Sequence, residues 1–151
     1  MADIPAAPHH HPSPHRDRVS DAALLLALAL GPASWAATLM LGYAAASHAC
    51  YPADTPVATL PPGWNDLRGA LVALDIACLG AALLGVGIAH RAWRATRAEK
   101  AGSPHALLDV GEGRSRFLAL CGVLAGLGFA LAIIFNIAVA AGVPACLGLG
   151  A

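Results

Sequence analysis

The stretch from Leu67 to His90, LRGALVALDIACLGAALLGVGIAH, restricts the fold of this chain more than any other feature. It is apolar along most of its length and carries a single carboxylate, Asp75. A helix needs about 20 mostly apolar residues, at a rise of about 1.5 Å each, to cross a lipid bilayer. We therefore expect a transmembrane helix at about residues 66–90.

Small residues recur at every fourth position of this stretch, and they predict a ridge with almost no side chain. Such a ridge lets the backbone of another helix approach closely. Asp75 lies nearly opposite the ridge, and an acid inside a membrane also calls for a contact. We therefore expect contacts on both sides of this helix. The predicted ridge consists of Gly69, Ala73, Ala77, Ala81, Gly85 and Ala89.

Two further apolar runs, at about residues 22–49 and 117–141, are also long enough to cross a membrane. Charged residues make up only 12% of the 151 residues, against about 25% in an ordinary soluble domain. These observations predict an all-α membrane protein with one domain of three transmembrane helices. The first run should kink at Gly31-Pro32, because Pro32 has no N–H to donate.

Small residues also predict packing faces on the first and third helices. In the third helix, Gly122, Gly126 and Ala130 form a GxxxG-type ridge. In the first helix, the repeat is partly polar, and its hydroxyl groups can bond across helices. This second face consists of Ser34, Thr38, Gly42 and Ala46.

Residues 1–20 are rich in proline and histidine, have no hydrophobic periodicity and predict a disordered tail. Neutral imidazoles bind transition metals, so the tail is a candidate metal site. Plain low complexity explains the same composition. The four histidines of the tail are His9, His10, His11 and His15.

The distribution of basic residues predicts the orientation of the helices. Eight of the nine Lys and Arg residues lie in the tail or flank the segment between the second and third helices, and Arg68 is the ninth. Because basic flanks stay on the cytoplasmic side, we expect the N-terminus inside and the C-terminus outside. The same basic segment can also contact anionic lipid or an acidic partner.

Cys50 and Cys146 both fall at the predicted outer ends of their helices, on the oxidising side of a bacterial inner membrane. A disulfide between them would tie the first helix to the third. Two unrelated small residues at helix ends are the alternative. Cys78 and Cys121 differ in depth, and we expect both to be packing residues.

Asp75 needs a partner, a proton or water, since a bare carboxylate within a bilayer costs several kcal/mol. Asn136 of the third helix is expected at a similar depth, Tyr43 somewhat shallower, and Arg68 two turns away on the same face. One interpretation of Asp75 is a proton-relay or cofactor-facing acid. The other is an interhelical or intersubunit hydrogen bond.

Motifs of phosphate or dinucleotide binding and zinc spacing of Cys and His are absent from the sequence. We expect no catalytic residues, no cofactor and no nucleic-acid partner. His48 and His90 fall at opposite membrane faces and cannot ligate one haem together.

About two thirds of the chain, without the tail, resembles a group of small three-helix membrane proteins encoded beside bacterial haem-copper cytochrome c oxidases. Recurring features of that group are an early Gly-Pro and Trp, a Tyr and Cys, an Arg-x-Arg-Phe-Leu-Ala entry to the last helix, and a final Pro-x-Cys or Pro-Cys. They correspond here to Gly31, Pro32, Trp35, Tyr43, Cys50, Arg114, Arg116, Phe117, Pro144 and Cys146. The proline-rich segment after Cys50 and the histidine-rich tail depart from that pattern.

The resemblance implies a non-catalytic accessory subunit of a respiratory complex in the bacterial inner membrane, namely a cytochrome c oxidase or its supercomplex. The expected partners are the larger subunits of that complex and lipids. Two alternatives remain. One is a metal-handling or assembly protein that uses the tail and the thiols of Cys50 and Cys146, and the other is a small proton-linked transporter that uses Asp75.

Overall fold

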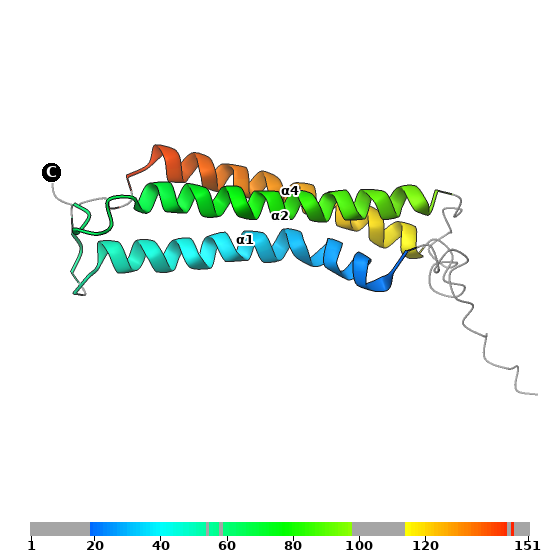
Figure 1. The fold of residues 1–151 in the computed structure, drawn as a ribbon, viewed down its shortest axis with the longest axis horizontal. Coiled ribbons are helices and arrows are strands. Elements are labelled where there is room, and N and C mark those ends of the chain that lie inside the picture. Colours follow the sequence, from blue (N-terminus) through cyan, green and yellow to red (C-terminus); the bar gives the residue numbers. More distant parts are fainter. Residues whose placement is uncertain (1–18, 54, 58, 98–113, 145, 147–151) are drawn as a thin grey trace, which may run out of the picture.

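The computed structural model describes residues 19–53, 55–57, 59–97, 114–144 and 146. In this part of the chain, three long helices lie side by side (Figure 1). They are α1 (Asp21–Cys50), α2 (Leu67–Ala95) and α4 (Arg114–Gly142). Each is long and apolar enough to cross a membrane, as predicted from the sequence. The predicted tail lies outside the described residues up to residue 18.

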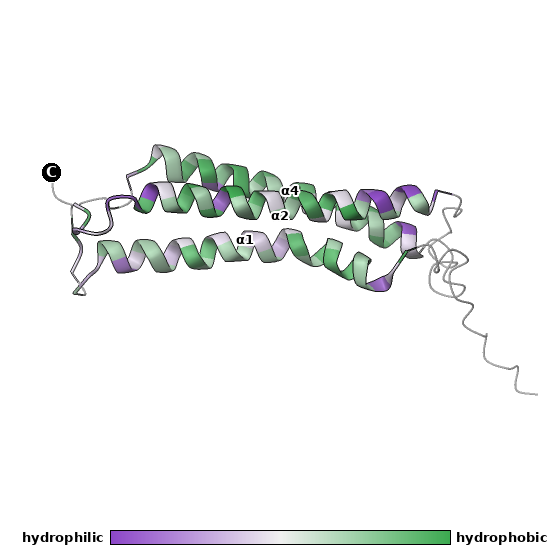
Figure 2. Ribbon diagram, viewed as in Figure 1, coloured by the Kyte–Doolittle hydropathy of each residue, from purple (hydrophilic) through white to green (hydrophobic). Residues whose placement is uncertain are grey.

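The helices extend beyond the predicted apolar runs, most clearly in α2, which continues for five residues after His90 to Ala95. A helix does not end where its apolar residues end, because each further residue still gains a backbone hydrogen bond. The stop comes at Thr96, whose hydroxyl donates to the carbonyl of Ala92 across 3.0 Å. Polar residues (purple) gather at this end of α2 (Figure 2).

One face of each helix is buried between the other two, with small residues at spacings of three and four. Such spacing places the residues on a single helical stripe. The buried stripe of α1 contains Leu24, Ala27, Gly31, Ser34 and Thr38, and that of α4 contains Ala119, Gly122, Gly126, Ala130 and Ile133. Large apolar side chains such as Met40 and Phe135 face outward, as lipid-facing residues do.

The backbones of α1 and α4 approach each other closely at Gly31 and Gly126. A Cβ built on Gly31 would lie 3.2 Å from the Cα of Gly126. A Cβ on Gly126 would lie 2.6 Å from Cγ2 of Val86, on α2. Gly126 therefore lies where all three helices meet, which confirms its predicted place on a packing ridge.

Pro32 lies within α1 without ending it. The helix bends in its N-terminal part (blue in Figure 1), in keeping with the predicted kink.

Two arginines flank the ring of Trp93 at one end of the bundle, which we call the arginine end. The guanidinium carbons of Arg97 and Arg116 lie 5.9 Å from the centre of that ring. Arg116 also donates from Nη1 to the carbonyl of Arg97 across 3.1 Å. The contacts connect the last turn of α2 to the first turn of α4 and stabilise this end through cation–π attraction.

Candidate functional site

A cleft of about 340 Å³ lies between α1, α2 and α4 in the half of the bundle away from the arginine end. Its lining is mainly apolar, and the polar side chains that interrupt it come from all three helices. We call it the Asp75 cleft, and its polar residues are Thr38, Tyr43, Arg68, Asp75 and Asn136. The four residues predicted to form an intramembrane polar contact are among them.

Asp75 lies on the buried stripe of α2, with only 6% of its surface exposed. It belongs to a series at spacings of seven and three, together with Ala82 and Gly85, which turns the carboxylate toward α1 and α4. None of the described residues donates a hydrogen bond to this carboxylate or pairs with it. Asn136, Tyr43 and Arg68, the candidate partners of Asp75, thus line the cleft with it without a direct hydrogen bond to it in the described chain.

Asn136 bonds α1 instead. Its Nδ2 donates to Oγ1 of Thr38 across 3.1 Å, and the Thr38 hydroxyl donates to the carbonyl of Trp35 across 2.8 Å. The sequence predicted that hydroxyls on this face of α1 bond across helices, and Thr38 does so. Thr38 is within reach of Asn136 because it is buried on the stripe of α1 that faces α4.

Arg68 and Tyr43 occupy the outer parts of the cleft. Arg68 is exposed, and its Nη2 lies 3.5 Å from the carbonyl of Val143, which α4 leaves without a helical partner near its end. Tyr43 is 78% exposed. The two residues therefore lie toward the rim, whereas Asp75 and Thr38 are the buried polar residues of the cleft.

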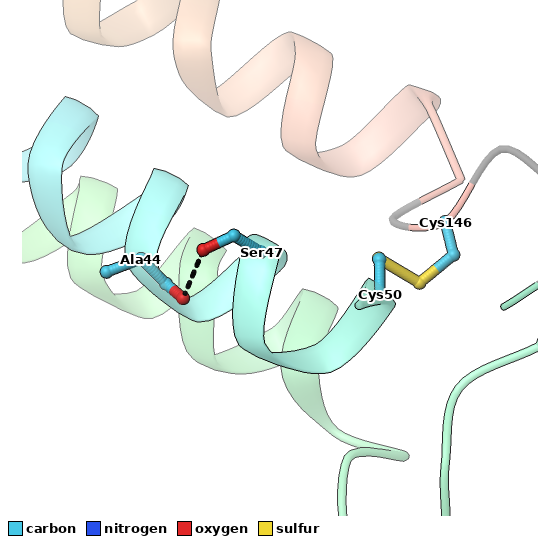
Figure 3. Close-up of a disulfide and its surroundings, with 4 residues drawn as sticks. All are labelled: Ala44, Ser47, Cys50 and Cys146. Carbon is cyan, nitrogen blue, oxygen red and sulfur yellow. Dashed lines mark hydrogen bonds between the residues drawn. A yellow bond between two sulfur atoms is a disulfide. The ribbon is translucent and has the colours of Figure 1, made fainter. Parts of the chain in front are cut away.

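A disulfide closes the bundle beyond the cleft, at what we call the disulfide end. The sulfur atoms of Cys50 and Cys146 are 2.06 Å apart, and their Cα atoms 5.5 Å (Figure 3). Cys50 ends α1, and Cys146 follows α4, so the link joins the first and third helices as the sequence predicted. The hydroxyl of Ser47 donates to the carbonyl of Ala44 in the turn before Cys50.

The predicted small-residue ridge of α2 divides into two parts. Gly85 and Ala89 are buried against the other helices, and a Cβ on Gly85 would lie 2.9 Å from Cβ of Leu30. Ala81 is half-buried. The remaining residues face outward, away from the other two helices. These exposed residues are Gly69, Ala73 and Ala77.

A step of four residues advances the direction of a side chain by about 40° on a helix with 3.6 residues per turn. Five such steps separate Gly69 from Ala89 and turn the ridge by about 200°. One series can therefore face the bundle at one end and the surroundings at the other. Gly80, which is exposed with nothing within 4 Å of a built Cβ, extends the outward part. We call Gly69, Ala73, Ala77 and Gly80 the outer ridge.

In the described ranges, His, Cys, Asp and Glu side chains form no group of three that could hold a metal ion. The four tail histidines lie outside those ranges. Cys78 and Cys121 are half-buried, and Cys78 packs beside Ala82, Ala130 and Ile133 as a packing residue would.

Sequence reasoning missed two features. The first is that Thr38, a hydroxyl on a predicted packing face, lines the cleft beside Asp75. The second is the contact of Trp93 with Arg97, which follows α2, and with Arg116 of α4. A tryptophan among basic residues near the end of a transmembrane helix was the available signal for it.

Comparisons with known protein families, curated proteins and solved structures find no match to this chain. The chemistry of the cleft itself is clear. It offers a buried acceptor at Asp75 and a guanidinium at its rim, between apolar walls.

Proposed function

We propose that this protein is a non-catalytic accessory subunit of a bacterial respiratory membrane complex, namely a cytochrome c oxidase or its supercomplex. The observation that carries the proposal is the outer ridge, a small-residue face of α2 that points away from α1 and α4. Small residues at a helix surface allow close backbone packing between transmembrane helices. The resemblance of the chain to the small proteins encoded beside such oxidases supplies the identity of the complex.

The outer ridge is suited to a protein contact more than to lipid. Lipid-facing positions of the same bundle carry large side chains, such as Leu131 and Phe135 on α4. The outer ridge instead exposes backbone over three helical turns, from Gly69 to Gly80. A partner helix that packs on the outer ridge makes closer van der Waals contacts than lipid tails can make there.

Co-purification tests this proposal, with Gly80→Leu as the ridge variant and Gly128→Leu as its matched control. Both glycines are exposed in helices, and neither has an atom within 4 Å of a built Cβ. We expect the wild-type chain and the control to be recovered from mild detergent in fixed ratio with haem-containing subunits. Gly80→Leu should lose most of this recovery, because its side chain fills the ridge.

Recovery of the wild-type chain alone, or equal recovery of haem subunits with both variants, contradicts the proposal. Mass spectrometry identifies the subunits, and a haem spectrum gives their ratio to the chain. Thermal unfolding of both variants shows that each one folds.

A proton-linked transporter is a second candidate, favoured by the burial of Asp75 in a cleft without a hydrogen-bonding partner among the described residues. Intramembrane acids of this kind carry protons in pumps and transporters. Vesicles that contain the purified chain and a pH-sensitive dye test it. Proton flux that Asp75→Asn abolishes would favour this candidate over the accessory subunit.

The metal-handling alternative uses two features, the histidine-rich tail and the thiols of Cys50 and Cys146, and the second is not present as thiols in this structure. Thiolates are the metal ligands that cysteine offers, and Cys50 and Cys146 are joined as a disulfide.

A further inference from the structure

The side chain of Asp75 is buried, and no described residue donates a hydrogen bond to it. More than nine-tenths of its surface is covered. A largely buried acceptor without a partner carries a desolvation cost, and a charged one carries more. Yet it lines a cleft that is open to the surroundings. What completes the hydrogen bonding of Asp75 therefore enters through that cleft.

Three polar side chains that line the cleft beside Asp75 make their hydrogen bonds elsewhere, and Tyr43 is exposed at its rim. Asn136 donates to Thr38, and Thr38 donates to Trp35. The guanidinium of Arg68 reaches the carbonyl of Val143. Among the described residues, Asp75 is thus left without a hydrogen-bond donor, and its cleft is open to one from another molecule.

The rim of the cleft indicates where that molecule comes from. Leu39, Val139 and Val143 line it and are exposed, so the walls that an entering molecule meets are apolar. Leu39 and Val139 lie within helices long and apolar enough to cross a membrane, and Val143 directly follows one of them. A volume of about 340 Å³ is at the lower end of small-molecule sites and holds a head group, but not a helix of about 10 Å diameter.

The charges of the cleft select the head group. A cation would be attracted by Asp75 but repelled by Arg68, and an anion would be attracted by Arg68 but repelled by Asp75, so neither gains from both residues. A neutral head is repelled by neither residue. A hydroxyl group donates to Asp75 and can accept from Arg68.

We propose that the Asp75 cleft binds the neutral, hydroxyl-bearing head group of a lipid-soluble molecule, with Asp75 as the acceptor of its hydroxyl. The apolar tail of the molecule leaves between α1 and α4 past Leu39 and Val139. Alkylated phenols and hydroquinones have this chemistry. This binding site is a property additional to the proposed accessory role, because residues of this chain form it without a partner subunit.

Native mass spectrometry of the full chain, released from detergent micelles, tests the proposal with 2-decylhydroquinone as the probe. Decylbenzene is the matched molecule without hydroxyls, and decylamine is the cationic one. We expect one hydroquinone per chain, bound at least about tenfold more tightly than decylbenzene, as a hydrogen bond to a charged group predicts.

Two variants act on the site by different routes. Asp75→Leu removes the acceptor, and Gly42→Phe places a ring in the cleft that Gly42 lines. Each should weaken hydroquinone binding about tenfold or more. Leu124→Ala, at an exposed position outside the cleft, should leave binding unchanged. Thermal unfolding verifies each fold, and Gly42→Phe keeps the test valid if Asp75→Leu does not fold.

Hydroquinone binding no tighter than that of decylbenzene overturns the proposal. So does binding that both folded variants retain, or tighter binding of decylamine, which would identify a cation site. The test uses the isolated chain, so its outcome is independent of whether the chain belongs to a respiratory complex.

Discussion

Asn136 donates from Nδ2 to Oγ1 of Thr38 across 3.1 Å, and the two residues are 98 positions apart in the sequence. The bond joins α4 to α1 at one end of the Asp75 cleft. The disulfide closes the bundle beyond the other end of the cleft. α1 and α4 are thus held together by this hydrogen bond, by the contact of Gly31 with Gly126, and by the disulfide. The cleft lies between the first and the last of these.

Thr38→Val should destabilise the bundle by about 0.6–2 kcal/mol, the measured range for hydrogen bonds between transmembrane helices. Valine keeps the shape of threonine but cannot accept from Asn136. A double-mutant cycle with Asn136→Leu, followed by unfolding in SDS, isolates the pair. Strictly additive effects of the two substitutions would show that the hydrogen bond contributes nothing.

Gly126→Ala should destabilise the bundle by about 1–3 kcal/mol through overpacking. The added methyl would lie 2.6 Å from Cγ2 of Val86, a branched side chain with little freedom to move. Gly128→Ala is the control, since nothing lies within 4 Å of its Cβ position. It should be neutral or slightly stabilising.

Val86→Ala should restore most of the stability that Gly126→Ala loses, as it removes the clash. Equal stability of Gly126→Ala and Gly128→Ala in SDS unfolding would argue against the close approach of α2 and α4.

Asp75→Leu should stabilise the isolated chain by about 1–3 kcal/mol. The side chain is largely buried and has no hydrogen-bonding partner among the described residues, so its desolvation cost is not recovered by them. SDS unfolding measures the difference, with the exposed Asp66→Leu as control. Loss of stability in Asp75→Leu would mean that the acid is bonded within the bundle after all.

Alkylation of the denatured chain should modify two cysteines before reduction and four after it. Cys50 and Cys146 are bonded, whereas Cys78 and Cys121 are thiols. Reduction should also destabilise the chain, by at most about 4–5 kcal/mol for a loop closed by 96 residues. Mass spectrometry counts the adducts. Four adducts without reductant would show that the bridge does not form.

The three helices could be predicted from the sequence because a long apolar run has few other stable structures in lipid. The Cys50 to Cys146 pairing was accessible for a related reason: helices that cross the same bilayer bring their ends to the same depth. The depth of a residue in the bilayer, however, does not determine toward which neighbour its side chain points. The direction in which a residue faces depends on which stripe of the helix the neighbours bury.

Asp75 illustrates this limit. Depth placed Asn136 near it and helical spacing placed Arg68 on its face, and both line its cleft. The sequence could not show that Thr38 would take the Asn136 donor, since that follows from the rotation of α1 about its axis. The same uncertainty of rotation hid which part of the α2 ridge faces outward.

Reporters fused to each end of the chain test the central claim most directly, because a chain that crosses the membrane three times has its ends on opposite sides. We predict fluorescence of a green fluorescent protein at the N-terminus and activity of an alkaline phosphatase at the C-terminus, because the basic segments are expected on the cytoplasmic side. The reverse fusions should be inactive. Reporters active on the same side, or a chain recovered in the water-soluble fraction, would contradict it.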